Sequence, residues 1–175
     1  MFTGIIEEIG TIESITPDQG GYRIRIAAPG IIPELRTDDS VAVNGICLTV
    51  TEIRGNTFSV DVVKESAERG TIKNWRAGSR INLERGMPAD GRFDGHLVQG
   101  HVDGTATLLK KERQGKSVVM TFEASEKLTA LMVEKGSIAI DGVSLTLTRV
   151  EKNTFTVALI PYSLEYTTLD ALSAG

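Results

Sequence analysis

The sequence predicts an all-β protein made of two homologous β-barrels in tandem, and an internal repeat is the main reason. Residues 40–58 (SVAVNGICLTVTEIRGNTF) recur as residues 137–155 (SIAIDGVSLTLTRVEKNTF) at an offset of 97, and 15 of the 39 aligned pairs from Ser40/Ser137 to Gly78/Gly175 are identical. An upstream match at offset 96 aligns MFTGIIEEIGTI with LVQGHVDGTATL. Two copies of roughly 90 residues favour two small domains, because a solenoid needs three or more repeats.

Short runs of alternating or β-branched residues predict the strands, and turn residues separate them. RGNT at 54–57 and EKNT at 151–154 are typical of hairpin turns. Three short helices are also expected, the second with Ser125 as its N-cap. The expected strands are 2–15, 22–28, 40–45, 47–53, 57–63 and 80–85 in the first copy and 100–111, 117–124, 136–142, 144–150 and 154–160 in the second; the expected helices are 66–75, 125–135 and 163–172.

Six short strands must bury one face and protect their edges, which a small closed barrel achieves. We expect an N-terminal barrel at 1–86, a linker at 87–94 and a C-terminal barrel at 95–175, because GMPADGRFDG (86–95) is rich in Gly, Asp and Pro and has no hydrophobic period. The first copy continues past Gly78 with the strand-like SRINLERG, whereas the second reaches Gly175 at the aligned position. The second barrel is therefore expected to lack its last strand.

Composition excludes several classes of function. The 175 residues carry a formal net charge of −4, which gives no electrostatic footprint for nucleic acid or an anionic membrane. No apolar run approaches the ~20 residues of a membrane span, and the acidic N-terminus does not resemble a secretory signal. The single cysteine, Cys47, permits no internal disulfide. We expect a soluble cytoplasmic protein. The spacing of His96, His101 and Cys47 is not that of a metal site, so no metal is expected.

Four motifs then resemble the riboflavin synthase family of trimeric, two-barrel lumazine-binding enzymes: MFTGII at 1–6, NGICLTV at 44–50, GHLVQGHVDG at 95–104 and DGVSLTLT at 141–148. The resemblance implies six-stranded Greek-key barrels and a homotrimer whose catalytic site lies between the N-barrel of one subunit and the C-barrel of the next. It also implies the family's reaction. Two molecules of 6,7-dimethyl-8-ribityllumazine dismutate by four-carbon transfer to riboflavin and 5-amino-6-(ribitylamino)uracil, the last step of riboflavin biosynthesis, without a metal or redox cofactor.

The repeat is consistent with that chemistry, since two similar pockets imply two similar ligands. Cys47 and Thr49 share one strand face, as do Ser144 and Thr146, and such groups suit the polar edge and hydroxyl chain of a flat ring. A dismutation gives the two molecules different roles, so the copies should differ at the chemistry. They do so at Cys47/Ser144, Asn44/Asp141, Ile5/His101 and Phe2/Val98.

His101 is expected to help remove a proton from the ring methyl, and Ser144 to activate a nucleophile at the acceptor ring. The expected catalytic residues are His101, Ser144, Cys47, Phe2 and Thr3. By resemblance, the first pocket uses Ser40, Cys47, Leu48, Thr49, Asp61, Val62, Val63, Lys64, Glu65 and Ser66. The second pocket uses Gly4, Ile5, Ile6, Gly100, His101, Val102, Ser144, Leu145, Thr146, Ile160, Pro161, Tyr162, Ser163, Leu164 and Glu165. Lys135 would reach the ligand of a neighbouring subunit.

Other interpretations of these residues stay open. A lone cysteine is most often a small buried hydrophobe, Ser144 and Thr146 also suit an ordinary strand, and His96 is interpreted as a structural histidine. The alternative function is a non-catalytic lumazine- or flavin-binding protein, such as the antenna proteins of luminous bacteria; a generic tandem-barrel binding module is a third. In the family the last strand of the second barrel carries an acidic residue, and a following helix holds the trimer. A chain ending at Gly175 is therefore expected to be a weak oligomer or monomer with poor turnover.

Overall fold

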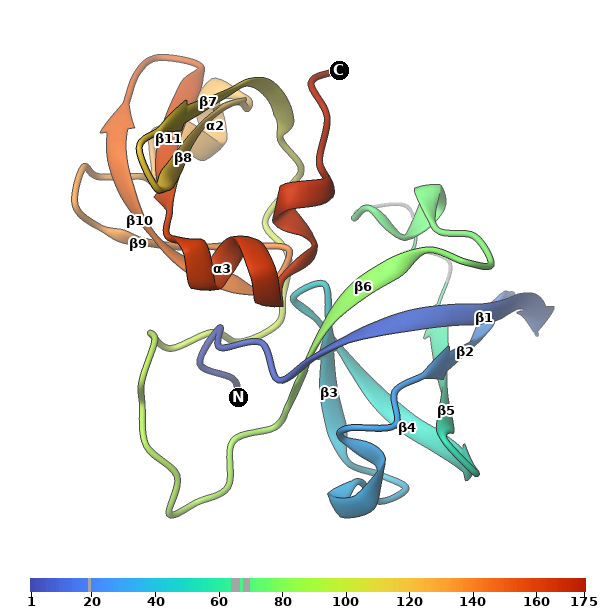
Figure 1. The fold of residues 1–175 in the computed structure, drawn as a ribbon. Coiled ribbons are helices and arrows are strands. Elements are labelled where there is room, and N and C mark those ends of the chain that lie inside the picture. Colours follow the sequence, from blue (N-terminus) through green and yellow to red (C-terminus); the bar gives the residue numbers. More distant parts are fainter. Residues whose placement is uncertain (19, 64–66, 68–69) are drawn as a thin grey trace.

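Alternating apolar residues in the first copy close a six-stranded antiparallel barrel (Figure 1). The computed structural model describes all residues except 19, 64–66, 68 and 69. The strands run in the order β1-β2-β5-β4-β3-β6, so that β6 lies beside β3, the first strand of the β3–β4–β5 meander, as a Greek key requires. The prediction of a Greek-key barrel is confirmed. The strands are β1 (Glu8–Asp18), β2 (Gly21–Ala27), β3 (Ser40–Val43), β4 (Ile46–Arg54), β5 (Thr57–Val63) and β6 (Arg80–Arg85).

The second copy forms a five-stranded sheet with the order β7-β8-β11-β10-β9. This order repeats β1-β2-β5-β4-β3, and no strand equivalent to β6 lies between β9 and β7 in the described part of the chain. Register irregularities also recur at equivalent places, at Val50/Glu52 in the first copy and Leu147/Arg149 in the second. The five strands are β7 (Thr107–Gln114), β8 (Ser117–Glu123), β9 (Ser137–Ile140), β10 (Val143–Val150) and β11 (Thr154–Leu159).

Each unit has its own apolar core. Ile24, Val60 and Leu83 are fully buried inside the barrel, and Met120 and Leu147 are buried in the second unit. At roughly 25 cal/mol per Å² of apolar area removed from water, such clusters supply the main drive for folding. The two units therefore each fold around a core of their own, as two repeat copies should.

The helices are shorter than predicted. The Ser125 hydroxyl caps α2 (Glu126–Thr129) by accepting a hydrogen bond from the Leu128 amide at 3.4 Å, which confirms the predicted cap. The expected helix at 163–172 is divided into α3 (Pro161–Tyr166) and the 3₁₀ turn η3 (Thr168–Ala171). Of the expected helix at 66–75, residues 66, 68 and 69 lie outside the described residues. The remaining 3₁₀ turns are η1 (Ile32–Glu34) and η2 (Ile72–Asn74). In the part of the chain described, no helix is long and apolar enough to cross a membrane.

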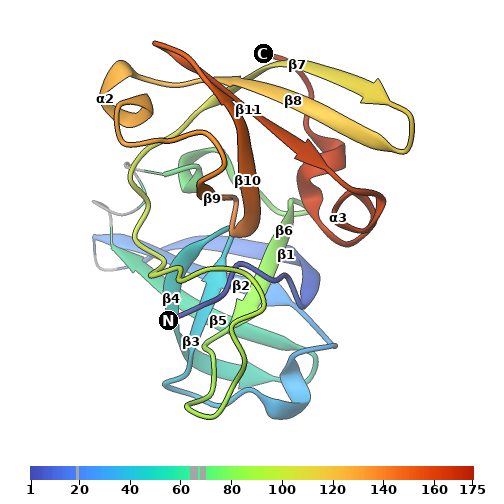
Figure 2. The ribbon, with the colours of Figure 1, turned by 90° about the vertical axis from the view of Figure 1, so that its left-hand side faces the viewer.

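Two strands begin later in the chain than the sequence predicts. The residues that precede them form tertiary contacts instead of continuing the strand. The strand expected at 2–15 starts at Glu8, and the strand expected at 100–111 starts at Thr107. Phe2 instead forms an isolated antiparallel bridge with Val98, and Ile6 packs against the core of the second unit. In both ribbon views the N-terminal segment runs beside the chain that connects the two units (Figures 1 and 2). The backbone groups of these segments are bonded across the boundary between the units.

Candidate functional site

The two copies meet at a pair of equivalent two-residue turns. Asn44 and Gly45 have φ values of 46° and 78°, and Asp141 and Gly142 have values of 45° and 81°. Positive φ at both central residues of a two-residue hairpin is the type I′ turn, which Asn-Gly and Asp-Gly favour. A Cβ on Gly45 would lie 2.7 Å from the Gly142 amide nitrogen, and one on Gly142 would lie 2.8 Å from that of Gly45. The turns therefore pack back to back, at a separation that only glycine allows.

A buried amide fastens these turns together. Asn82 on β6 is fully buried, and its backbone amide donates to Asn44 Oδ1 at 2.7 Å. Its side-chain Nδ2 donates to the Asp141 carbonyl at 2.9 Å, while its Oδ1 accepts from the Thr168 amide at 2.8 Å. A buried polar side chain with all its groups bonded specifies one arrangement of its neighbours. Asn82 thereby fixes the second unit against the first.

The first half-site, as we name the surroundings of Cys47 and Gly100, joins β4 to the incoming chain of the second copy. The Cys47 amide donates to the Gly100 carbonyl at 2.9 Å. A Cβ on Gly100, which has a φ of +83°, would lie 2.5 Å from Cys47 Cβ. The grouping inferred from the sequence placed Gly100 with Ser144 in the second pocket, whereas in the fold the Gly100 backbone contacts Cys47. The chain crosses between the units here, which the repeat alone does not reveal.

The second half-site, formed around Ser144 and Gly4, is its counterpart on β10. The Ser144 amide donates to the Gly4 carbonyl at 2.7 Å, and a Cβ on Gly4, at φ +78°, would lie 2.7 Å from Ser144 Cβ. His96 Nδ1 lies 2.7 Å from Ser144 Oγ. The sequence pattern was interpreted as giving His96 a structural role, and the structure places its imidazole on the hydroxyl of Ser144, the residue expected to activate a nucleophile. Its spacing of five residues from His101 gave no signal of this contact.

Phe2 and Val98 lie between the two half-sites, where the alignment of the copies pairs them. The Phe2 amide donates to the Val98 carbonyl at 2.8 Å and the reverse bond measures 3.0 Å. Phe2 is fully buried and forms a small cluster with Ala42, Val98 and Cys47. Phe2, one of the expected catalytic residues, therefore packs against Cys47 in the first half-site.

Strand alternation arranges the remaining expected residues. Leu48 and Leu145 point into the two cores, while Cys47, Thr49, Ser144 and Thr146 face the other way, as predicted. Thr49 pairs with Ser40 across β3 and β4. The side chains of Ile5, His101, Val102 and Lys135 are exposed, and no hydrogen bond joins them to one another in the described part of the chain.

Other expected residues lie on β5 and α3. Asp61 accepts two hydrogen bonds from the Arg23 guanidinium, at 2.8 and 3.1 Å, so its carboxylate is already engaged. Val62 is in the barrel core and Val63 is exposed, while Lys64, Glu65 and Ser66 lie outside the described residues. On the second copy, Ile160 and Pro161 are exposed, and Leu164 packs on the core. Tyr162 stacks on Tyr166 with ring centroids 4.5 Å apart, on the same helix as Ser163 and Glu165.

Burial perturbs three titratable groups at this junction. Desolvation lowers the pKa of His96, which favours the neutral imidazole with one acceptor nitrogen. Burial raises the pKa of Glu84, although hydrogen bonds from Thr3 and Gly4 oppose that rise. Burial raises the pKa of Asp141 to about 6. Perturbed groups cluster at functional sites, so the junction between the copies is the candidate site.

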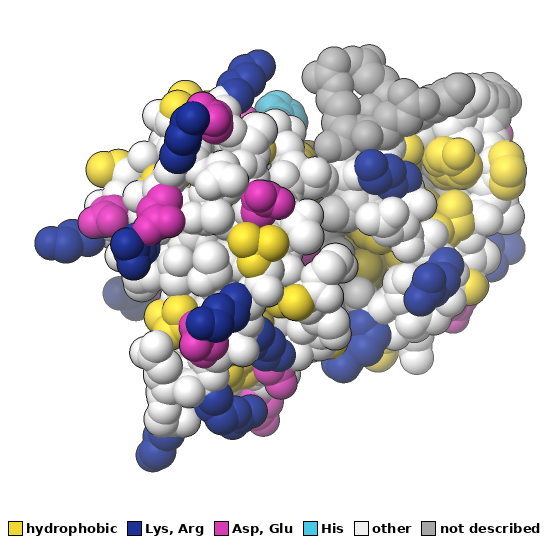
Figure 3. Space-filling model, turned by 90° about the horizontal axis from the view of Figure 1, so that it is seen from above, with side chains coloured by type: hydrophobic (Ala, Val, Ile, Leu, Met, Phe, Trp, Pro, Cys, Tyr) yellow, Lys and Arg dark blue, Asp and Glu magenta, His cyan; other side chains and the backbone are white. Residues whose placement is uncertain are grey.

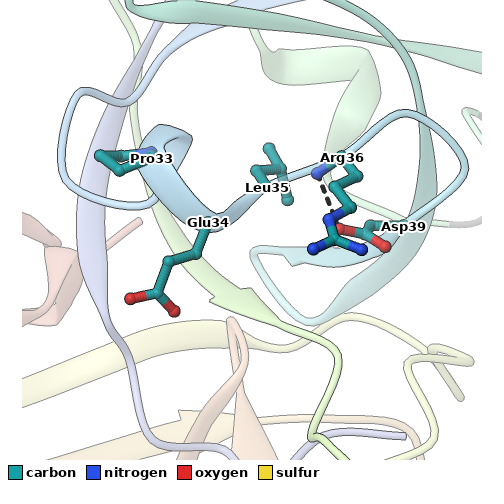
Figure 4. A pocket seen from close by; sticks show the side chains of 5 residues that line it. All are labelled: Pro33, Glu34, Leu35, Arg36 and Asp39. Carbon is teal, nitrogen blue, oxygen red and sulfur yellow. Dashed lines mark hydrogen bonds between the residues drawn. The ribbon is translucent and has the colours of Figure 1, made fainter.

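Two hollows lie on the first unit. One, of about 560 Å³, lies between the N-terminal segment and the linker, and its lining includes Thr3, Ile5, Ser40 and Glu84. That volume is in the range of small-molecule pockets, and three of these four residues were expected at the site. The other, of about 450 Å³, is lined by η1 and its following loop and contains none of the expected residues (Figure 4). In Figure 4 the Arg36 amide bonds to the Asp39 carboxylate at 2.8 Å.

The surface chemistry adds two observations. Among the described residues, Lys and Arg side chains lie close to Asp and Glu side chains over the left part of the face shown in Figure 3. Among the residues that the structure describes, no three His, Cys, Asp or Glu side chains are grouped to hold a metal ion.

Known proteins share this sequence and this fold. The lumazine binding domain family matches residues 3–86 and again residues 99–175. The riboflavin synthase of Bacillus subtilis (strain 168) is 43% identical over the whole chain, which spans 81% of that relative. The riboflavin synthase of Brucella abortus is 39% identical over the whole chain, which spans 89% of it. That of Schizosaccharomyces pombe is 39% identical over 93% of this chain and 79% of its own.

Solved structures agree on the fold. LumP complexed with riboflavin superimposes with a TM-score of 0.90 at 24% identity, over 100% of this chain and 95% of the other. LumP complexed with 6,7-dimethyl-8-(1'-D-ribityl) lumazine gives a TM-score of 0.88 at 23% identity with the same coverage. Identity this low supports the fold alone, whereas the curated relatives match over nearly all of both barrels. The duplicated match and the full-length identity together show that the chain belongs to the lumazine-binding, riboflavin synthase family.

Proposed function

We propose that the two half-sites hold the two molecules that the riboflavin synthase reaction consumes. The full-length similarity to curated riboflavin synthases, at 39–43% identity, supports that activity, a transferase reaction, for this chain. In it, one 6,7-dimethyl-8-ribityllumazine passes a four-carbon unit to another. The observation that carries the proposal is the pair of equivalent half-sites that differ at Cys47 and Ser144. A purely ligand-binding role is not favoured, because the curated relatives that match the whole chain at 39–43% identity are named riboflavin synthase.

The residue roles follow from the contacts of each half-site. The first pocket would use Ser40, Thr49, Cys47 and the 100–102 segment, and the second would use Ser144, Thr146, the 4–6 segment and α3. Hydroxyls suit the ribityl chain, and backbone amides and carbonyls suit the polar ring edge. A neutral His96, bonded to Ser144 at 2.7 Å, is suited to accept the hydroxyl proton and so to activate Ser144 or a water molecule beside it. The exposed His101 would serve the first pocket, next to Gly100.

The domain boundaries, assembly and location belong to the same proposal. We infer barrels at 1–86 and 95–175, a linker at 87–94, a cytoplasmic location and no resident cofactor. We also infer self-association, as a homotrimer. Leu131 and Val133 are 77% and 68% exposed beside Lys135, whose backbone has a positive φ of 68°. An apolar surface at this point would let Lys135 approach a neighbouring subunit's ligand. Sedimentation of the protein with and without ligand measures this association.

The decisive experiment mixes the protein with 6,7-dimethyl-8-ribityllumazine and follows riboflavin by absorbance and fluorescence. We expect one riboflavin for every two lumazine molecules consumed, because the reaction is a dismutation. Consumption in another ratio would contradict the four-carbon transfer. Tight binding without conversion would favour the non-catalytic alternative, and no binding would exclude a lumazine ligand altogether.

A further inference from the structure

Thr3 and Gly4 form a bridge between the two units, and Glu84 of the first barrel holds one side of it. The Thr3 amide and hydroxyl donate to Glu84 Oε1 at 2.6 and 2.7 Å, and the Gly4 amide donates to Oε2 at 2.9 Å. Both carboxylate oxygens are therefore occupied by this short segment. Glu84 itself is fixed on β6, opposite Ala42 of β3.

The other side of the same bridge belongs to the second half-site. The Thr3 carbonyl accepts from the His96 amide at 3.0 Å, and the Gly4 carbonyl accepts from the Ser144 amide at 2.7 Å. His96 and Ser144 are the two residues whose side chains bond at 2.7 Å. All four backbone polar groups of Thr3 and Gly4 therefore connect Glu84 to the His96–Ser144 pair.

Glu84 is suited to this task because it is an acceptor at both oxygens. It is only 4% exposed, and no ion pair between described residues includes it. Three donors thus replace the water that its carboxylate loses. The charged neighbours are Glu7, which opposes ionisation of Glu84, and Arg85, which is already bonded to Glu7 and Glu34. A glutamine at position 84 would replace one acceptor oxygen by an NH2 group, which can only donate, whereas the Thr3–Gly4 segment presents only donors to Glu84.

We propose that Glu84, on the first barrel, is a positioning residue for the His96–Ser144 pair of the second half-site. The Glu84 carboxylate fixes the position and orientation of the Thr3–Gly4 segment. That segment in turn fixes the backbone amides of His96 and Ser144, and so the positions from which their side chains extend. The catalytic consequence rests on the proposed function, whereas the positional coupling does not.

The test compares Glu84→Gln with Glu8→Gln. Glu8 is a matched control because its Oε2 also accepts a backbone amide, that of Ile31 at 2.9 Å, away from both half-sites. The chain has two histidines, so ¹⁵N and ¹H spectra report His96 directly, with exposed His101 as an internal reference. In Glu84→Gln we expect the pKa of His96, which burial lowers, to rise toward the ordinary histidine value, whereas in Glu8→Gln the pKa of His96 should stay at the wild-type position.

Turnover provides the second measurement. A displacement of about 1 Å can cost up to roughly a hundredfold in rate, so kcat of Glu84→Gln should fall at least about tenfold. KM should change less than about threefold, because the residues that line the pocket outside the Thr3–Gly4 segment are unchanged. If wild-type protein shows no turnover, the proposed function fails, while the His96 spectra still decide the coupling.

A milder variant guards against loss of folding. Thr3→Val keeps both backbone bonds to Glu84 and removes the hydroxyl bond to Glu84 Oε1, together with the longer bond of 3.4 Å that the hydroxyl accepts from the Ile5 amide. A smaller shift of the His96 titration in the same direction would support the proposal. Unchanged His96 signals in either variant, or kcat of Glu84→Gln within twofold of wild type, would overturn it.

Discussion

Replacing Gly100 by alanine should damage the first half-site more than the backbone conformation alone explains. A Cβ at Gly100 would lie 2.5 Å from Cys47 Cβ, 2.9 Å from the Cys47 amide nitrogen and 3.0 Å from Phe2 Cε2. Both Cys47 atoms belong to the packed strand β4, and Phe2 is fully buried, so none of the three atoms can move away freely. The substitution must therefore push the chain at 100 away from β4.

The size of the effect follows from two terms. A non-glycine residue in the left-handed region costs about 1–2 kcal/mol. Overpacking a well-packed contact adds about 1–3 kcal/mol. Together they predict a loss of roughly 2–5 kcal/mol in the free energy of unfolding. At roughly 2–4 °C per kcal/mol for a chain of this size, Tm should fall by about 4–20 °C.

Gly78→Ala is the matched control, because Gly78 has nearly the same φ, +86° against +83°, but nothing lies within 4 Å of its Cβ position. In urea unfolding followed by circular dichroism, Gly78→Ala should lower the free energy of unfolding only by the cost of the left-handed backbone, about 1–2 kcal/mol. Equal losses in the two variants would refute the close approach of Gly100 to Cys47.

Two other predictions concern single side chains of the junction. Asp141→Asn, which copies Asn44 of the first repeat, should stabilise the protein by about 1–2 kcal/mol at pH 7.5, since a rise in pKa from 3.8 to about 6 corresponds to at most about 3 kcal/mol. A raised folded-state pKa disfavours folding only at pH values where the carboxyl ionises, so the stabilisation by Asp141→Asn should disappear at pH 3.5. A stabilisation of equal size at both pH values in urea titrations would contradict the raised pKa of Asp141. Ser144→Ala should lower kcat by at least about tenfold and leave lumazine binding at the first half-site intact. Equilibrium fluorescence titration beside steady-state kinetics checks it, and an unchanged kcat would remove Ser144 from the reaction.

Local patterns predicted most of the strands, because side-chain alternation and turn chemistry act over a few residues. The repeated C/S-L-T pattern predicted the shared faces of Cys47 with Thr49 and of Ser144 with Thr146, whereas the type I′ geometry of the Asn-Gly and Asp-Gly turns came from the structure. Period-two reasoning fails on β6, where it assigns Asn82 and Glu84 to solvent. Both are buried, at 0% and 4% exposure, because the second unit and the N-terminal segment cover that face of the barrel. Coverage by a distant part of the chain leaves no periodic signal.

The sequence by itself determined that the protein is a duplicated β-fold, since a repeat with aligned turns and strand alternation has few other physical solutions. The family came from a different source, the resemblance of four motifs to those of the lumazine-binding, riboflavin synthase family. Only the tertiary structure decided which parts meet. Alignment shows that Gly4 is equivalent to Gly100 and Cys47 to Ser144, but equivalence does not say which copy each glycine packs on. The chain crosses between the units, so Gly100 bonds Cys47, Gly4 bonds Ser144, and His96 rather than His101 contacts the serine. Those pairings depend on contacts between residues 48 to 140 positions apart, which short-range patterns do not encode.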